Sequence, residues 1–583
     1  MLNLSRVVLS CCCVLMTVFA SGSAWSQAVV ADSGLKQPII RYPSIHHPVE
    51  GRYGMVVSQN ALATSVGQDI LMQGGNAIDA SVAVAFALAV TLPRAGNLGG
   101  SGFMLAHFAQ QNKTIALDYR SVAPLTASVE KFSKADGEMD WDKLTFGPMA
   151  PAVPGTVAAM HQAWQQYGSM PWADLLRPAF QLASEGIEVW PDLAHVLNMA
   201  SAVLNYYSSD SAYLKNDKSR WLAGDTLVQK DLAWSIGQIM EHGADAFYRG
   251  ELAEKIVSSF ENSGGIISRE DLKNYEVKQR TPVQTSYRGK QVISMPPVSG
   301  GGVTLLQMLN MLEHFPVGEQ RAGSALNLHL LAEVMKRAAA NRRSLLGDPD
   351  FVKVHVEGFI SKELAAKMAK DINTRKATSI KRIKAEPVER YESRNTTQFS
   401  VMDRYGNAVS NTYTLGYSFG SGFVASGTGI LFDNQMRNFS YRSDSNHMNS
   451  LEPGKRMLST MTPTIVLNED GKVFLVTGTP GGGRIINVVL QVLVNVIDHH
   501  MNIAEATHQP RIHQGWRSST LGIERGMNPE VVNILQRMGN KVEMQQTMGS
   551  TQSIMWLNGK FFGAADSRRP NALALGLNRE PGS

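Results

Sequence analysis

The stretch from Asn395 to Gly420 constrains the fold of this chain more than any other. Two adjacent threonines, Thr396 and Thr397, open a short alternation of apolar and polar residues. Tyr405-Gly406-Asn407 supplies turn residues, and a second run rich in β-forming residues returns from Val409 to Leu415. Two such runs joined by a glycine-containing turn predict a β-hairpin. The threonine pair is therefore expected at the start of a strand.

A threonine hydroxyl is a poor nucleophile until a base removes its proton. One known arrangement uses the α-amino group of the same residue, which is free only after the chain has been cut just before it. The reference pKa of an α-amino group is about 7.7 to 8.0, so part of it is neutral near physiological pH and accepts a proton. A Thr-Thr pair is more often an ordinary strand surface, so the pair alone does not establish catalysis.

Further motifs accompany the threonine pair. Beside Thr396-Thr397-x-Phe399-Ser400-Val401, the chain carries Gly406-Asn407-Ala408-Val409, Thr412-Tyr413-Thr414 and Phe419-Gly420. This set resembles the signature of the γ-glutamyltranspeptidase family, whose members are N-terminal-nucleophile hydrolases that cut their own precursor. Other blocks resemble those of the family and follow its order along nearly the whole chain: Met55 to Val57, Gly74 to Ala80, Gly99 to Phe103, Val153 to Thr156, Pro296 to Gly301 and Pro480 to Gly482.

The resemblance implies both a fold and an activity. The expected fold is α+β, a four-layer αββα sandwich formed jointly by a large and a small subunit after autocleavage between Asn395 and Thr396. The expected activity is cleavage of the γ-glutamyl amide bond of glutathione and related compounds through an ester on Thr396. The acyl group then passes to water or to an acceptor amino acid or peptide. No cofactor is expected, because a nucleophile, a base and oxyanion donors suffice for this chemistry.

The resemblance also assigns roles to single residues. Thr396 matches the nucleophile, the Thr414 hydroxyl matches its hydrogen-bond partner, and Gly481 and Gly482 match the oxyanion hole. The positions that match substrate contacts are Arg120, Gln435, Asn438, Ser459 and Thr460. The planar fork of an arginine suits a carboxylate, here the α-carboxylate of the substrate. From the residues alone, Arg120 equally fits an ion pair with Asp118, and Thr414 fits an ordinary strand threonine.

Three positions depart from the family pattern and bear on substrate choice. Gln398 replaces a usual histidine, Gly416 a usual asparagine or glutamate, and Asn438 the aspartate that usually receives the substrate ammonium. Losing that carboxylate is expected to cost about 1 kcal/mol or more in discrimination, which corresponds to about five- to tenfold. A glutaryl-amide amidase, similar to the cephalosporin-acylase branch of the family, therefore stays open as an alternative. A non-catalytic periplasmic binding protein with the same fold is the other.

The first 24 residues are expected to be a secretory signal. Arg6 precedes an apolar run from Val7 to Phe19, which is followed by the small residues Ala20 to Ala24. The run is shorter than the roughly 20 residues that a membrane span needs, so a membrane anchor is the weaker interpretation. All three cysteines lie inside this segment. The exported protein, periplasmic or secreted, would therefore contain no disulfide and depend on burial alone.

The large subunit would then comprise residues 25–395 and the small catalytic subunit residues 396–583. Charged residues make up 18% of the chain and its net charge is +5, which is small for 583 residues and gives little support for nucleic acid as a partner. The basic stretch from Asn373 to Arg394 is interpreted as a solvated linker that ends at the processing bond. The spacing of His499, His500, His508 and His513 fits no standard metal site.

Apolar periodicity predicts many helices around a few strands. Strong helical patterns occupy Ala61 to Gln73, Ala77 to Thr91, Leu193 to Val203, Ala325 to Leu345 and Ile485 to Ile497. Strand patterns occupy Phe103 to Phe108, Thr114 to Tyr119, Val283 to Tyr287, Gln291 to Met295 and Val473 to Thr477. The glycine-rich segment Gly96 to Gly102 lacks the Lys-Ser/Thr of a phosphate loop and precedes a strand, so nucleotide binding is not expected there.

Overall fold

The computed structural model describes residues 44–383, 395–441, 447–515 and 518–582. The predicted leader with its cysteines and the end of the predicted linker, residues 384–394, lie outside the described residues. From His46 onward the chain forms one compact unit. Within the described ranges, no helix is both long enough and apolar enough to cross a membrane.

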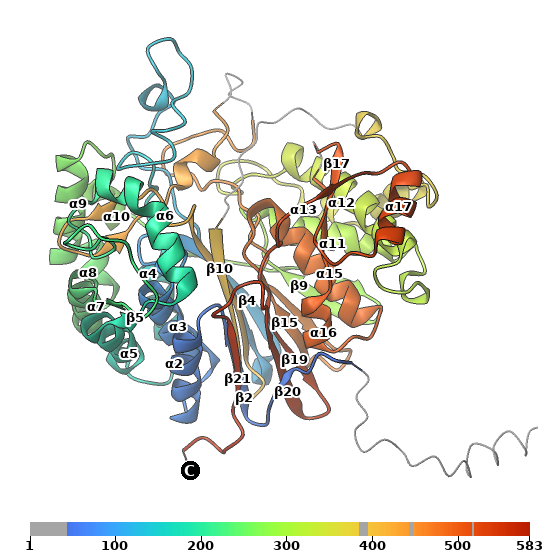
Figure 1. Ribbon diagram of the computed structural model, residues 1–583, viewed down its shortest axis with the longest axis horizontal. Coiled ribbons are helices and arrows are strands. Elements are labelled where there is room, and N and C mark those ends of the chain that lie inside the picture. Colours follow the sequence, from blue (N-terminus) through green and yellow to red (C-terminus); the bar gives the residue numbers. More distant parts are fainter. Residues whose placement is uncertain (1–43, 384–394, 442–446, 516–517, 583) are drawn as a thin grey trace, which may run out of the picture. The chain divides into compact units, whose positions relative to one another are not determined.

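Two antiparallel sheets, each seven-stranded within the described residues, form the centre of this unit (Figure 1). The first sheet runs in the order β1 (Val49–Gly51), β20 (Lys560–Ala565), β19 (Gln552–Leu557), β15 (Val473–Thr477), β14 (Thr464–Leu467), β9 (Lys290–Ser294) and β8 (Val283–Tyr287). The second runs in the order β21 (Leu573–Gly576), β2 (Gly54–Ser58), β10 (Asn395–Asp403), β11 (Ala408–Gly416), β3 (Ser101–Phe108), β4 (Lys113–Tyr119) and β7 (Lys278–Arg280). Both sheets therefore contain strands from before and after Thr396.

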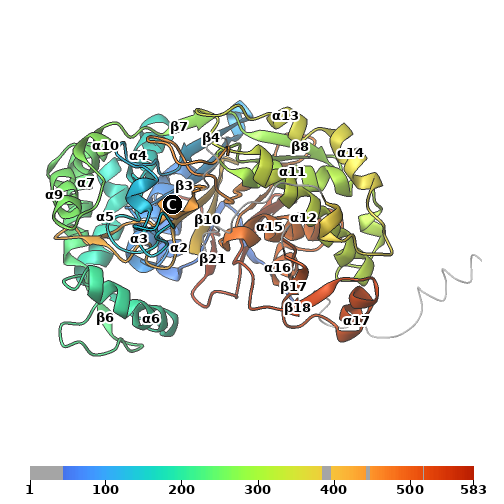
Figure 2. The same ribbon diagram turned by 90° about the horizontal axis from the view of Figure 1, so that it is seen from above.

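Helices cover the outer face of each sheet (Figures 1 and 2). On the side of the second sheet, its strands are contacted by α2 (Ala61–Met72), α3 (Ala77–Thr91) and α4 (Thr156–Tyr167). The same apolar core also includes α5 (Trp172–Glu185), α6 (Pro191–Tyr207), α7 (Lys230–His242), α8 (Ala244–Tyr248), α9 (Glu251–Asn262) and α10 (Arg269–Lys273). On the side of the first sheet, its strands are contacted by α11 (Gly300–Leu312) and α16 (Ile503–His508). The same apolar core also includes α12 (Ala325–Leu345), α13 (Val356–Phe359), α14 (Lys362–Lys370), α15 (Ile485–Ile497) and α17 (Pro529–Arg537).

The alternation of side chains along each strand explains why four layers form. In β10, Phe399 and Val401 belong to the core under α2 and α3, whereas Met402 belongs to a separate core between the sheets. In β14, Val466 packs toward the helices and Ile465 into the core between the sheets. Successive strand residues point to opposite faces, and here both faces are buried. The predicted αββα sandwich is confirmed.

Several predicted elements are confirmed with unchanged bounds, among them α3, α12, α15, β8 and β15. The predicted helix Leu193 to Val203 is too short, because α6 spans Pro191–Tyr207. Its last turn contains Tyr206, which is 80% exposed and therefore lies outside the apolar pattern that marked the rest of the helix.

The described part of the predicted linker is anchored to the fold. Buried Glu333 on α12 accepts hydrogen bonds from Lys336 Nζ (2.7 Å), Arg337 Nη1 (2.6 Å) and the Thr378 backbone N–H (3.0 Å). Arg337 also donates to the Asp371 carbonyl (2.9 Å). The chain is therefore held at Thr378, ahead of the segment that leads to Asn395.

Candidate active site

Thr396 lies at a β-bulge at the start of an inner strand. Asn395 faces Gly416 and Thr397 faces Tyr413, so between these pairs the partner strand β11 carries two residues, Thr414 and Leu415, opposite Thr396 alone. A bulge of this kind redirects a side chain, and bulges are frequent beside active sites. The Thr396 side chain is 4% exposed, and its Oγ1 donates to Thr414 Oγ1 at 3.2 Å. The structure therefore brings together the two threonines that the sequence singled out.

Arg120 follows β4 and lies beside these threonines. Its Nη1 donates to Ser101 Oγ (3.4 Å), and Ser101 pairs with Thr414 across β3 and β11. Its Nε donates to the Met457 carbonyl (3.2 Å). Burial lowers the pKa of Arg120 to about 10, so the guanidinium stays charged at neutral pH. A cation is thus connected to the Thr396 hydroxyl through three contacts, by way of Ser101 and Thr414.

The alternative in which Arg120 pairs with Asp118 through its guanidinium does not describe the observed contacts. Asp118 Oδ1 accepts from the backbone N–H of Arg120 (3.1 Å), while Oδ2 accepts from Arg280 Nε (2.8 Å). The carboxylate of Asp118 therefore binds Arg280 on the neighbouring strand β7, and the Arg120 guanidinium donates to Ser101 and Met457 instead.

Asp433, two residues before Gln435, is a buried residue of the site that the sequence does not predict. It is fully buried and accepts hydrogen bonds from Ser121 Oγ (2.6 Å), the Ala152 N–H (3.0 Å) and the Gln435 N–H (3.2 Å). Burial raises the pKa of Asp433 to about 7, against the opposing effect of these donors and of Arg120. Asp433 thereby ties the Gln435 backbone to the segment that follows Arg120.

Gln435 and Asn438 begin and end a short 3₁₀ turn, η5 (Gln435–Asn438). Asn438 Nδ2 donates to Gln435 Oε1 at 2.5 Å. The remaining side-chain atoms of the pair, Gln435 Nε2 and Asn438 Oδ1, are buried without a hydrogen-bond partner among the described residues. Buried polar atoms normally have a partner. This neutral amide pair is therefore suited to receive polar groups of a ligand.

The structure gives a physical reason for the glycine at 416. Gly416 has φ +92°, and a Cβ built there would lie 2.1 Å from Asn434 Oδ1. Asn434 is held in that place because its Oδ1 accepts from the Tyr417 N–H (3.1 Å) and its Nδ2 donates to the Thr145 carbonyl (3.1 Å). The Asn434 carboxamide thus fills the space that a side chain at 416 needs.

Two adjoining segments carry the other predicted site residues: Ser459 and Thr460 lie on one, and Gly481 and Gly482 on the other. Thr460 Oγ1 donates to the Gly482 carbonyl at 2.9 Å, and Ser459 Oγ accepts from the Met461 N–H at 3.2 Å. Gly481 and Gly482 have φ of +138° and +58°, values that favour glycine. The 3₁₀ turn η6 (Gly482–Arg484) then leads into α15. The turn Gly481–Gly482 therefore rests on the hydroxyl of Thr460.

Gln398 joins the hairpin to the other sheet. Its Nε2 donates to Ser410 Oγ (3.1 Å) and to the Phe399 carbonyl (2.8 Å), and its Oε1 accepts from Thr412 Oγ1. A Cβ at Gly478, the residue after β15, would lie 2.3 Å from Gln398 Oε1. Gln398 is thus buried between the sheets, and its uncharged carboxamide provides hydrogen-bond partners for the hydroxyls of Ser410 and Thr412.

The histidines considered for metal binding have other contacts. His508 stacks on His46 with ring centroids 4.9 Å apart, and His513 Nδ1 lies 2.8 Å from Asn487 Nδ2. Among the described residues, there is no group of three or more His, Cys, Asp or Glu side chains placed to hold a metal ion.

Two antiparallel sheets between helical layers, with a threonine at the head of an inner strand, define the class of the N-terminal-nucleophile hydrolases. The chain belongs to the γ-glutamyltranspeptidase family: the sequence model described as gamma-glutamyltranspeptidase matches residues 63–576.

Relatives and solved structures extend this similarity over almost the whole chain. The chain is 43% identical over 576 residues to a glutathione hydrolase proenzyme of Escherichia coli K12, covering 97% of this chain and 98% of the relative. It is 35% identical over 544 residues to the acylase ACY 1 proenzyme of Pseudomonas sp. SE83, covering 91% and 96%. The crystal structure of a cephalosporin acylase from Bacillus halodurans superposes with a TM-score of 0.82 at 29% identity, covering 94% of this chain and all of that one.

Proposed function

We propose that this protein is a glutathione hydrolase and γ-glutamyltransferase that matures by cutting its own chain between Asn395 and Thr396. The observation that carries the proposal is the Thr396–Thr414 hydroxyl contact of 3.2 Å at the bulge that opens β10. In the uncut chain the Thr396 nitrogen is a peptide amide and cannot act as a base. Cutting converts it into an α-amine attached to the residue that carries the nucleophile.

The reaction then proceeds through an acyl-enzyme. Thr396 Oγ1 attacks the γ-carbonyl carbon of the donor while its α-amine takes the hydroxyl proton. The backbone N–H groups of Gly481 and Gly482 hold the negative charge that develops on the carbonyl oxygen. The amine half of the donor leaves with that proton, which produces a γ-glutamyl ester on Thr396. Water or the amine of an acceptor amino acid or peptide attacks the ester and restores the hydroxyl.

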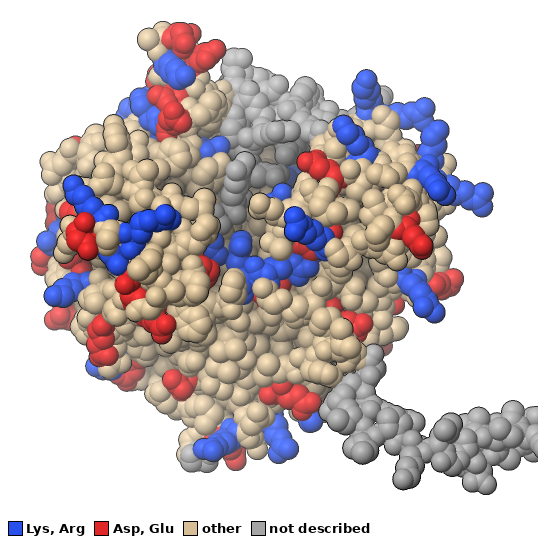
Figure 3. Space-filling view, viewed as in Figure 1, with Lys and Arg blue, Asp and Glu red and all other residues tan. Residues whose placement is uncertain are grey.

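Substrate binding is assigned to the polar residues around the threonines. The Arg120 guanidinium, with the Ser459 and Thr460 hydroxyls, would hold the α-carboxylate, and the pair Gln435–Asn438 would face the α-amino group. On the face drawn in Figure 3, acidic and basic side chains are interspersed over most of the surface, and basic ones also gather in a hollow near its middle. A basic hollow favours a donor that carries carboxylates, as glutathione does.

The mature enzyme is proposed to be a heterodimer of residues 25–395 and 396–583, exported to the periplasm or medium after loss of residues 1–24. The end of the proposed large subunit is held to the fold as far as Thr378, whose backbone contacts Glu333 and Lys336 on α12. The large subunit then contributes β2, β3 and β4 to the sheet that presents Thr396, so the two pieces stay together through strand pairing.

A denaturing gel with mass spectrometry, combined with a γ-glutamyl anilide assay, tests the proposal. The wild-type protein is expected to give two fragments, the smaller beginning at Thr396, and to release the aniline. Thr396→Ala is expected to remain uncut and inactive. An intact bond between residues 395 and 396 together with undiminished amidase turnover would refute the mechanism, and a wild-type chain that stays uncut and inactive would favour the non-catalytic binding protein.

A glutaryl-amide amidase is the second candidate, and the uncharged pair Gln435–Asn438 favours it. Neither residue offers a carboxylate to an ammonium group, and Gly416 offers no side chain. Initial rates on γ-glutamyl and glutaryl anilides, with and without an acceptor dipeptide, decide between the two. Much faster turnover of the aminated substrate would show that the weakened ammonium contact does not set the preference.

A further inference from the structure

Thr479 fixes the backbone immediately before the predicted oxyanion glycines. It lies between the end of β15 and Gly481 and is fully buried. Its Oγ1 donates to the Pro480 carbonyl at 2.8 Å and accepts from the Ser550 N–H at 2.8 Å. One hydroxyl therefore connects the turn that carries Gly481 to a second loop, Met548–Thr551, from a distant part of the chain.

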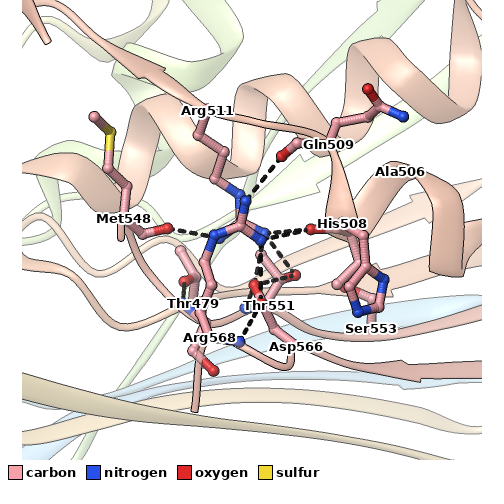
Figure 4. Close-up of polar contacts among 12 residues, drawn as sticks. Thr479, Ala506, His508, Gln509, Arg511, Met548, Thr551, Ser553, Asp566 and Arg568 are labelled. Atoms are coloured by element: carbon pink, nitrogen blue, oxygen red, sulfur yellow. Dashed lines mark hydrogen bonds and ion pairs between the residues drawn. The ribbon is translucent and has the colours of Figure 1, made fainter. Parts of the chain in front are cut away.

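Both ends of the Met548–Thr551 loop are held by a buried ionic network (Figure 4). Arg511 Nη1 donates to the Met548 carbonyl (2.6 Å), and its Nη2 donates to Asp566 Oδ2 (2.6 Å). The same Asp566 oxygen accepts from the Thr551 N–H at 2.9 Å. Arg511 and Asp566 are almost completely buried, so their bonds are shielded from water and salt. The loop is thus anchored independently of the predicted active-site turn.

The loop and the turn are also in steric contact. A Cβ at Gly549 would lie 2.6 Å from Thr479 Oγ1 and 3.1 Å from the Pro480 carbonyl oxygen. A Cβ at Gly481 would lie 3.4 Å from Gly549 Cα. The two segments therefore pack backbone to backbone, and the Thr479 hydroxyl is the polar link between them.

We infer that Thr479 is a positioning residue for acyl transfer, which sets the direction of the Gly481 and Gly482 N–H groups and is itself held by the Arg511–Asp566 network. The inference rests on the proposed function, since it assumes that these N–H groups hold the oxyanion. Glycine has few conformational restrictions of its own, so a turn with positive φ at both glycines needs an external constraint to keep its donors aligned. Preorganised donors stabilise the transition state because they need not reorganise during the reaction.

Thr479→Val and Thr479→Ser test the inference on processed protein whose active sites have been titrated. Valine keeps the shape and removes the hydroxyl, whereas serine keeps the hydroxyl. We expect Thr479→Val to lower kcat for a γ-glutamyl anilide by about 10- to 100-fold, less than the roughly 100- to 1,000-fold of removing an oxyanion donor outright, with KM within about twofold. Thr479→Ser is expected to keep kcat within about threefold. Thr91→Val, which removes a buried hydroxyl on α3 that donates to Ala87, is the control and should keep wild-type kcat.

Each outcome decides the question. Wild-type kcat in Thr479→Val overturns the inference, and inactivity of Thr396→Ala in the same series shows that the proposed function still stands. Turnover by Thr396→Ala refutes the proposed function instead. A loss in Thr479→Val that Thr479→Ser shares, or that appears equally in Thr91→Val, also overturns the inference. If Thr479→Val remains uncut, Gly549→Ala takes its place, because the added Cβ would clash with the Thr479 hydroxyl. A lowered kcat in the cut fraction of Gly549→Ala supports the inference, and an unchanged kcat overturns it.

Discussion

Gly416→Ala tests whether the backbone beside Thr396 excludes a side chain. The substitution adds a Cβ at φ +92°, where it would meet Asn434 Oδ1 at 2.1 Å. The backbone strain costs about 1 to 3 kcal/mol. The Asn434 carboxamide must also move, which breaks its bonds to the Tyr417 N–H and the Thr145 carbonyl and costs about a further 1 to 3 kcal/mol.

Gly137→Ala is the matched control, because Gly137 has φ +83° and a Cβ there would meet no atom within 4 Å. It carries the strain without the collision. At about 2.1 cal/mol/K of unfolding entropy per residue, a compact unit of this size loses roughly 1 °C of melting temperature per kcal/mol. We therefore expect Gly416→Ala to melt about 1 to 3 °C below Gly137→Ala in a thermal scan of the processed protein.

A double-mutant cycle with Asn434→Ala isolates the collision. Once the carboxamide is gone, Gly416→Ala should add only its strain. The combined loss is then expected to be smaller than the sum of the single losses by about 1 to 3 kcal/mol. Equal melting temperatures for Gly416→Ala and Gly137→Ala, together with additive effects in the cycle, would refute the steric argument.

Three further predictions concern charged side chains, two of them at the site and one on α12. Asn438→Asp should raise the γ-glutamyl-to-glutaryl rate ratio by about five- to tenfold, because the new carboxylate gives the ammonium of the γ-glutamyl donor a charged partner. The Gln435 amide can turn its unpaired Nε2 to the same carboxylate, and an unchanged ratio would contradict the prediction. The raised pKa of Asp433, about 7 against an ordinary 3.8, favours its protonated form in the folded protein. Protonation of Asp433 therefore stabilises the folded protein below about pH 4, and this stabilisation is lost as pH rises toward 7. The melting temperature of the wild type relative to Asp433→Asn should fall over that range. A difference in melting temperature that does not change with pH would exclude the raised pKa of Asp433. Glu333→Gln leaves the buried cations Lys336 and Arg337 without their carboxylate and should lower the free energy of unfolding by about 3 to 5 kcal/mol. A thermal scan should show a drop of several degrees in melting temperature. Glu319→Gln, on the exposed surface, is the control and should leave the melting temperature unchanged.

Local signals in the sequence were strong enough to predict most elements around the site. The unbroken apolar run of α3 begins after Asn76, whose side chain accepts hydrogen bonds from the first turn of the helix. The hairpin β10–β11 followed from two β-type runs and a glycine turn. These signals depend on neighbours within a few residues, which is why they can be recognised without the fold.

The contacts that complete the site connect residues far apart in the chain, and no local pattern marks them. Ser121 and Asp433 are separated by 312 positions, and the Arg120 guanidinium reaches Met457 across 337. A period of two predicts only that successive residues of β10 face opposite sides of the sheet. It does not show whether the side that carries the polar residues is exposed to solvent or buried. Gln398 and Ser400 are instead buried against the other sheet.

The threonine pair at a strand start and the helices around it can be read from periodicity and turn residues alone, and the family motifs and their order imply the layered α+β fold. Three features of the site became visible in the folded protein: Thr396 lies at a bulge opposite Thr414, Asn434 occupies the space beside Gly416, and the Arg511–Asp566 network holds the loop that contacts Thr479. These depend on which surfaces meet when the two sheets pack, and close packing leaves each buried polar group only the partners that the packed neighbours provide.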